Sequence, residues 1–191
     1  MKRKTVVYLD KPGRKGCPAC LEAAAERAAE LGVRHVVVAT SSGRTGLEMA
    51  RALRAAGSRA AVVGVGYAAN FAAKWGRLEK RFTAPAEKLG AVFIAGTHAL
   101  GGVNGAVRDR FGGCATPGNL IAGAYYTFGQ GMKVAVEVAL MAADQGAVPT
   151  DREILALGGT AEGADTAVVL SPACSQDFFK LRVHEVVCMP R

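Results

Sequence analysis

The sequence has 191 residues, of which half are hydrophobic and only 6% are aromatic. This length is typical of one domain, so we expect a single domain over residues 1–191 with a core built mainly from Ala, Val and Leu. A chain of this size buries roughly 70% of its unfolded surface, so it needs no disulfide or metal ion to hold it together. Its net charge of +8 favours anionic partners.

Nucleic acids and membranes are not indicated as partners. Basic residues gather in the first fifteen residues and again from Lys74 to Lys88, but neither cluster combines base-stacking aromatic residues with a known nucleic-acid motif. No apolar run approaches the about 18 residues of a spanning helix. The run that follows Met1–Lys4 covers only Val6–Leu9, too short for an export signal. We expect a cytoplasmic protein whose five cysteines are mostly reduced thiols.

The first third of the chain alternates short β-rich runs with Ala-rich runs of helical spacing, which indicates parallel strands joined by crossover helices. Strands are predicted at Thr5–Leu9, His35–Ala39 and Ala60–Val65, and helices at Pro18–Leu31 and Thr45–Ala56. The almost unbroken apolar run of the second strand is typical of a central strand covered on both faces.

The rest of the chain is predicted with one interruption. From Gly66 to Pro85 aromatic residues mix with glycine and basic residues, which indicates an irregular excursion that could serve as a lid. The elements predicted after it are a short helical turn at Ala86–Leu89, strands at Ala91–Ala95, Ile154–Leu157, Thr166–Leu170 and Val183–Cys188, and helices at Pro117–Phe128 and Met132–Gln145. The predicted fold class is α/β, with three layers and a mostly parallel sheet flanked by helices.

The strongest functional signal lies between the second predicted strand and its helix. A loop at the carboxyl end of a parallel strand is where open α/β sheets bind ligands, and the following helix offers free N–H groups to an anion. An ordinary helix cap needs one hydroxyl, whereas this loop has several hydroxyls, a glycine and an arginine. It is not a Walker A motif. We predict a phosphate-binding loop formed by Thr40, Ser41, Ser42, Gly43, Arg44 and Thr45.

This loop resembles the turn that holds a phosphate of the sugar bisphosphate activator in the carboxy-terminal α/β domain of pyruvate kinase. The counterpart of that domain's second glycine-rich loop is Gly158–Thr166, which adds Gly159, Thr160, Gly163 and Thr166 as candidate ligand contacts. The whole chain is similar to stand-alone archaeal and bacterial proteins of this fold. The shared segments are Lys11–Gly13, Met141–Asp144 with Gly146–Ala147 and Pro149, Gly163–Val169 and Cys188–Arg191.

The resemblance implies two things about function. The catalytic barrel of pyruvate kinase is absent, so we do not expect phosphoryl transfer to ADP. Stand-alone members are associated with flavin mononucleotide (FMN), whose phosphate would suit the predicted loop, so the chain could be a flavoprotein oxidoreductase. The alternative is a regulatory module that senses a sugar phosphate without chemistry of its own. Whether the chain is an enzyme and whether it forms a homo-oligomer stay open.

Several other residues are weaker candidates. His98 follows a predicted strand at the same sheet edge and could hydrogen-bond a flavin ring or a substrate carbonyl, or be a polar loop residue. Gly113 could line the pocket. Cys17 and Cys20 have redox spacing at a helix start, where a thiol has a lowered pKa, but two small helix-start residues are the alternative. No second pair of zinc ligands is visible, so no metal is predicted. Lys133 and Glu137 are interpreted as a solvent-side ion pair, and Asp165 as shaping its glycine-rich loop.

Overall fold

A computed structural model describes residues 3–191; Met1 and Lys2, from the predicted basic start of the chain, lie outside the described residues. One seven-stranded sheet runs through it in the order β1-β7-β6-β5-β2-β3-β4. The strands are β1 (Val7–Leu9), β2 (His35–Ala39), β3 (Ala61–Gly66), β4 (Val92–Ala95), β5 (Ile154–Gly158), β6 (Thr166–Ser171) and β7 (Arg182–Pro190).

The sheet is mostly parallel, as predicted. The pairs β1–β7, β2–β3, β2–β5 and β3–β4 are parallel, whereas β6 runs antiparallel to both of its neighbours. The carboxyl ends of the other strands therefore lie along one edge of the sheet, which we call the carboxyl edge. The loops after β2, β3, β4 and β5 all begin at this edge.

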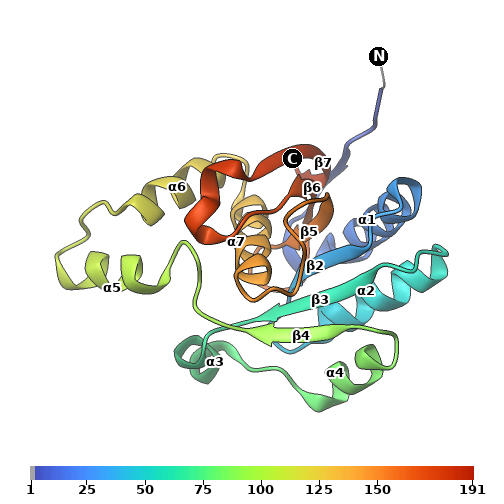
Figure 1. The fold of residues 1–191 in the computed structure, drawn as a ribbon, viewed down its shortest axis with the longest axis horizontal. Coiled ribbons are helices and arrows are strands. Elements are labelled where there is room, and N and C mark those ends of the chain that lie inside the picture. Colours follow the sequence, from blue (N-terminus) through green and yellow to red (C-terminus); the bar gives the residue numbers. More distant parts are fainter. Residues whose placement is uncertain (1–2) are drawn as a thin grey trace.

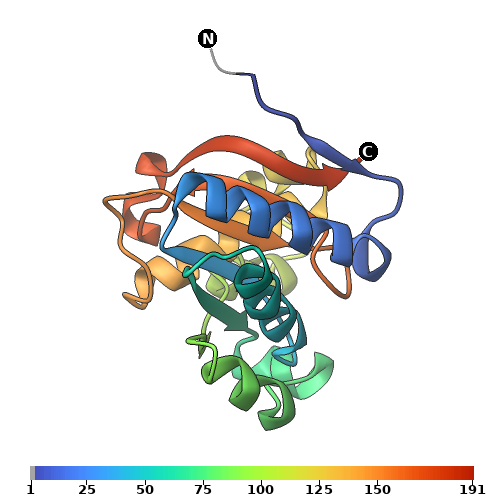
Figure 2. The ribbon, with the colours of Figure 1, turned by 90° about the vertical axis from the view of Figure 1, so that its right-hand side faces the viewer.

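Helices cover both faces of the sheet and make the three predicted layers. Helices α1 (Cys17–Leu31) and α2 (Arg44–Ala55) pack on one face together with Val36 and Val38 of β2. Helix α7 (Gln130–Asp144) packs on the other face with Val37. Successive side chains of β2 point to opposite faces, so this one strand contributes to the hydrophobic cores on both sides of the sheet. Figure 2 shows α1 and α2 side by side across the sheet.

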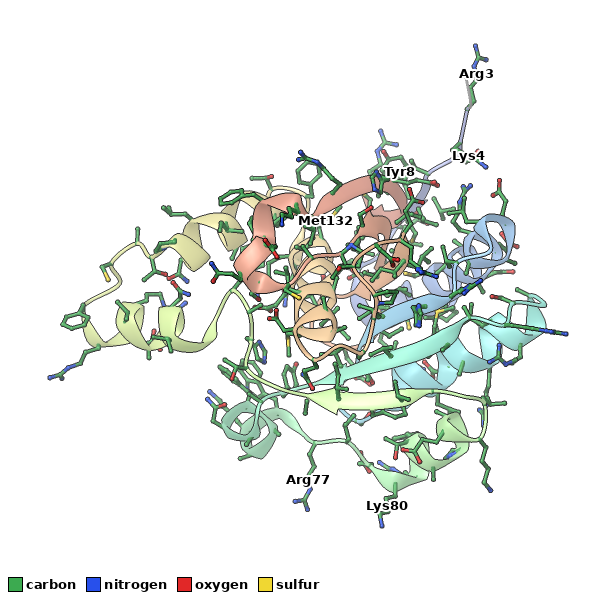
Figure 3. All side chains as sticks on the ribbon, in the orientation of Figure 1. Arg3, Lys4, Tyr8, Arg77, Lys80 and Met132 are labelled. Atoms are coloured by element: carbon green, nitrogen blue, oxygen red, sulfur yellow. The ribbon has the colours of Figure 1, made fainter. Side chains whose placement is uncertain are left out.

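The segment predicted as irregular is helical, so that prediction was wrong. It contains α3 (Ala69–Trp75) and most of α4 (Lys80–Glu87), and the helical turn predicted at Ala86–Leu89 consists of the last two residues of α4 and the two that follow. None of the residues of α3 is buried, and α4 buries only Ala86. A helix that buries none of its residues has no apolar stripe facing a core, which is why the sequence of α3 gave no helical signal. Arg77 and Lys80 in this segment point outward (Figure 3), as expected for solvated basic residues.

Two further helices form an arm at one side of the molecule (Figure 1). They are α5 (Gly102–Arg110), which the sequence did not predict, and α6 (Pro117–Tyr126). Contacts of Ala122 with a cluster that includes Val136 and Leu140 hold α6 against α7. Helix α5 buries none of its residues and again lacks a periodic signal. Among residues 3–191, no helix has the length and apolar character needed to cross a membrane.

Candidate functional site

The predicted phosphate loop lies at the carboxyl edge, directly after β2. Gly43 has a left-handed conformation (φ 94°) and is the residue before the first turn of α2. It has no side chain to cap the helix, so the first-turn N–H groups of Thr45 and Gly46 have no intrahelical acceptor and no N-cap side chain. This arrangement differs from an ordinary Ser/Thr cap and leaves the positive end of α2 without a capping side chain.

The hydroxyl groups of the loop have different surroundings. The Thr40 Oγ1 atom is buried and accepts a hydrogen bond from the Gly43 N–H at 3.0 Å, so it shapes the turn. Ser42 Oγ is a long 3.4 Å from the Arg44 N–H. Ser41 and Ser42 are half-buried, Thr45 is buried at the helix start, and Arg44 is exposed. Ser41, Ser42 and Arg44 are therefore the loop side chains with the freest access to a ligand.

Helix α4 and the residue before it pack against this loop. The Glu79 N–H, just before α4, donates to the Ser42 carbonyl at 2.9 Å. A Cβ atom on Gly43 would come within 2.9 Å of Thr83 Cγ2. The segment predicted as a lid is therefore packed against the loop, and Gly43 permits the close approach.

The second glycine-rich loop connects β5 to β6 and lies beside the first. Fully buried Asp165 organises it, as predicted: its carboxylate accepts hydrogen bonds from the N–H groups of Thr160 (3.0 Å) and Gly13 (2.7 Å). A Cβ atom on Gly159 would lie 1.9 Å from the Gly163 carbonyl oxygen, so only glycine fits there. Thr166 is completely buried, and its hydroxyl donates to Asp165 at 2.9 Å, so it supports the loop from within.

Sequence reasoning missed a charged group that joins these loops. Arg14 makes a bidentate contact with Glu48 of α2 at 2.6 and 2.7 Å, and Arg44 Nε lies 3.1 Å from the same carboxylate. The hydrogen bonds from Arg14 are the main reason that the pKa of Glu48 is lowered. Arg44 also reaches to 3.9 Å from Glu162 of the second loop. The Arg44–Glu48 spacing of one helical turn was visible in the sequence, whereas the contact with Arg14 was not.

A hollow in the surface lies beside this group, and none of its lining residues belongs to Thr40–Thr45. It has a volume of about 520 Å³ and runs between α1 and α2. Its lining residues are Arg14, Pro18, Leu21, Glu22, Ala25, Glu26, Glu48, Ala52, Ala55 and Ala56. Only Arg14 and Glu48 belong to the candidate site.

His98 lies at the carboxyl edge after β4, in a second polar group on the α7 side. Its Nδ1 atom is 3.6 Å from Glu137 Oε2, which also pairs with Lys133. The prediction that Lys133 and Glu137 form a solvent-side pair was wrong, because Glu137 is only 3% exposed. The helical spacing was read correctly, but the segment with His98 and Leu100 covers this part of α7, where the Leu100 N–H donates to Glu137 at 3.0 Å. No hydrogen bond or ion pair within residues 3–191 joins His98 to Thr40–Thr45.

The charge of Glu137 gives a testable dependence of stability on pH. Burial alone raises its pKa, but His98 and Lys133 outweigh burial and hold the pKa at about 2, below the ordinary 4.5. Since the folded pKa is depressed, this stabilisation is complete above pH 4.5 and is lost as the pH falls towards 2. We expect urea unfolding of Glu137→Gln to depend less steeply on pH in this window, by up to about 1.4 kcal/mol per pH unit. Glu26→Gln, on an exposed carboxylate, should keep the wild-type slope; equal slopes for all three proteins would contradict the assignment.

Gly113 and the two remaining histidines lie elsewhere. Gly113 is an exposed left-handed glycine whose N–H donates to the Arg108 carbonyl at 2.8 Å, so it ends α5 in the arm. His184 hydrogen-bonds Ser171 at 2.8 Å between neighbouring strands. His35 is half-buried at the start of β2, and burial lowers its pKa.

The two cysteines of the Cys-x-x-Cys motif are fully buried and are not joined by a disulfide. Burial raises the pKa of Cys17, contrary to the lowering expected at a helix start, and its sulfur accepts the Ala164 N–H at 3.4 Å. The pKa of Cys20 is also raised, mainly by its hydrogen bond with Cys188 and secondly by burial. No cluster of three metal-ligating side chains occurs in the described part of the chain.

The order in which the cysteines react with a thiol reagent should therefore follow their solvent exposure, and Cys17 and Cys20 should not behave as a redox pair. With a thiol reagent under native conditions, we expect exposed Cys114 to react first and half-buried Cys174 later. Cys17, Cys20 and Cys188 should react only on unfolding, because all three thiols are buried, and the raised pKa values of Cys17 and Cys20 make these two poorer nucleophiles still. Cys114→Ser should remove the fast phase. Rapid reaction of Cys17 or Cys20, suppressed by prior oxidation, would restore the redox interpretation.

No model of a known protein family matches the chain. The resemblance to the pyruvate kinase carboxy-terminal domain stays a prediction that depends on the sequence motifs, whereas the α/β class and the mostly parallel sheet are features of the structure.

Proposed function

We propose that the chain binds a phosphorylated small molecule at the Thr40–Thr45 loop, and that this molecule is FMN. The observation that carries the proposal is the uncapped start of α2 at the carboxyl edge, where Gly43 replaces a capping side chain and Ser41, Ser42 and Arg44 are accessible. Helix N–H groups, hydroxyl groups and a guanidinium are the donors that phosphate monoesters prefer. The choice of FMN depends on the sequence resemblance.

The neighbouring loops support the same proposal. Arg44 is shared between Glu48 at 3.1 Å and Glu162 at 3.9 Å, both at least partly exposed to solvent. A phosphate would offer Arg44 a stronger bidentate partner than either carboxylate. The net charge of +8 favours encounter with an anion.

Titration of the purified protein with FMN and with riboflavin tests this proposal directly. Riboflavin has the same ring system but lacks the phosphate. We expect FMN to quench on binding and riboflavin to bind at least about 100-fold more weakly, since two charge-assisted hydrogen bonds would be lost. Equal affinity for both, or no binding of either, would exclude FMN recognition through the loop.

A non-catalytic sensor of sugar phosphates uses the same loop and is the second candidate. It predicts no affinity for FMN but a higher melting temperature with a sugar bisphosphate. At about 100 times its dissociation constant, the ligand should add about 2.7 kcal/mol to the free energy of unfolding. A panel of phosphorylated metabolites therefore separates the two candidates.

A further inference from the structure

One ring nitrogen of His98 has no protein partner. Nδ1 faces Glu137 at 3.6 Å, whereas Nε2 is shielded from solvent and has no hydrogen-bond partner among residues 3–191. Buried polar atoms without partners are uncommon in folded proteins, and sites of chemistry are one of the places where they occur. Nε2 therefore needs an explanation that the surrounding protein does not supply.

Glu137 decides which nitrogen of His98 carries the proton. Its Oε1 atom accepts the Leu100 N–H at 3.0 Å, and its Oε2 atom faces both Lys133 and His98. A carboxylate beside Nδ1 favours the proton on that nitrogen, so neutral His98 has its lone pair on Nε2. In this tautomer Nε2 accepts a proton and cannot donate a hydrogen bond to a carbonyl. A hydrogen bond from Nε2 to a substrate carbonyl, one of the alternatives left open by the sequence, would require the other tautomer.

Aromatic rings from the residue after β3 and from α3 cover His98. The Tyr67 ring stacks parallel to the imidazole, with 5.8 Å between centroids, and the Phe71 ring lies 4.9 Å away. Trp75 contacts both of these rings. Because no residue of α3 is buried, these ring contacts are the main packing of the helix. Such a cover can open at little free-energy cost.

We propose that His98 is the proton-transferring residue of a site that enolises a small carbonyl compound at the carboxyl edge. Nε2 takes a proton from the carbon next to the carbonyl: the C–H bond breaks, the N–H bond forms, and the electron pair moves onto the carbonyl oxygen. Return of the proton restores the imidazole, so the step needs no oxidant or reductant. Glu137 is a positioning residue, and α3 with Tyr67 is the cover.

Besides a base, a site that enolises a carbonyl compound needs a positive group near the carbonyl oxygen, and Lys133 can supply it. Its ammonium group has three N–H donors and pairs with Glu137 Oε2 beside His98. A positive charge at this position would stabilise the oxygen that becomes negative during enolisation. The inference does not depend on phosphate binding at Thr40–Thr45, because none of its residues belongs to that loop.

The tautomer of His98 can be measured on the intact protein. In long-range proton–nitrogen NMR spectra, with signals assigned by their loss in His98→Gln, we expect neutral His98 to be protonated at Nδ1. Glu137→Gln should weaken this preference and Glu137→Asp should retain part of it, while His184 should be unchanged in both. A wild-type His98 protonated at Nε2 would overturn the proposal.

The chemistry is tested by exchange of carbon-bound hydrogen in D₂O. The probes are dihydroxyacetone and dihydroxyacetone phosphate, followed by loss of their C–H signals. We expect the wild type to exchange at least one probe, and His98→Gln to be slower by about 10²–10⁴-fold, the range for a positioned general base. His184→Gln should match the wild type. No exchange of either probe above the buffer rate would overturn the proposal.

The same assay separates this inference from phosphate binding. If both are right, Ser42→Ala combined with Thr45→Ala should slow exchange of the phosphorylated probe only. If phosphate does not bind at the loop, the two probes should behave alike and still require His98.

Discussion

Replacing Ser42 and Thr45 together with alanine is expected to abolish discrimination between FMN and riboflavin. Ser42 is half-buried and only weakly engaged by the Arg44 N–H at 3.4 Å, so its hydroxyl is available to a phosphate. Thr45 lies in the first turn of α2. Hydrogen bonds to a charged group contribute about 1.5–3 kcal/mol each, so the double variant should lose about 10²–10⁴-fold in affinity for FMN. Fluorescence titration measures both ligands with the same protein.

Ser58→Ala is the matched control for this experiment. Ser58 Oγ accepts the Ala60 N–H at 3.2 Å, the same two-residue turn that Ser42 makes, but it precedes β3 at the opposite edge of the sheet. Its loss should lower stability about as much as the loss of Ser42 without changing affinity for FMN. If the double variant still binds FMN more tightly than riboflavin, the phosphate is held elsewhere. A sugar bisphosphate titrated in parallel tests the sensor alternative with the same variants.

The strands and the phosphate loop were predictable because their signals are local. The apolar run of β2 ends at Ala39, and the hydroxyl-rich turn follows at once, so the sequence shows both the strand and its carboxyl end. The reversed direction of β6 was also within reach. Its connection to β5 is Gly159–Asp165, which is shorter than the dozen or more residues of a parallel crossover.

What the sequence did not show depends on contacts between distant segments. Arg14 and Glu48 are partners only because the short 3₁₀ helix Gly13–Lys15 and α2 meet at the carboxyl edge. Lys133 and Glu137 have the spacing of a surface pair, and only the fold brings the segment with His98 and Leu100 over Glu137. Helices α3 and α5 bury no residues, so no hydrophobic period marks them.

Substitution of Asp165 is expected to have the largest effect on stability of any single change at the site. Its fully buried carboxylate accepts three hydrogen bonds, from the N–H groups of Gly13 and Thr160 and from the hydroxyl of Thr166. Asp165→Ala leaves three donors without an acceptor, which should lower the free energy of unfolding by about 3–5 kcal/mol. Asp165→Asn keeps one acceptor oxygen but turns an amide N–H₂ towards donors, so a loss of about 1–3 kcal/mol is expected. Urea unfolding measures both.

Asp144→Ala is the control for Asp165→Ala, because it also removes an aspartate that accepts hydrogen bonds, but an exposed one. Asp144 also accepts a backbone N–H and a hydroxyl, both from Ser175. It is exposed, so water can replace its carboxylate, and the free energy of unfolding should fall by less than about 1 kcal/mol.

Because Asp165 ties the turn at Gly13 to the loop that includes Glu162, its loss should also free Arg44 from one of its partners. We therefore expect Asp165→Asn, folded at low temperature, to bind FMN with altered affinity although Asp165 never contacts the ligand. An Asp165→Ala protein as stable as Asp144→Ala would mean that another group holds these loops together.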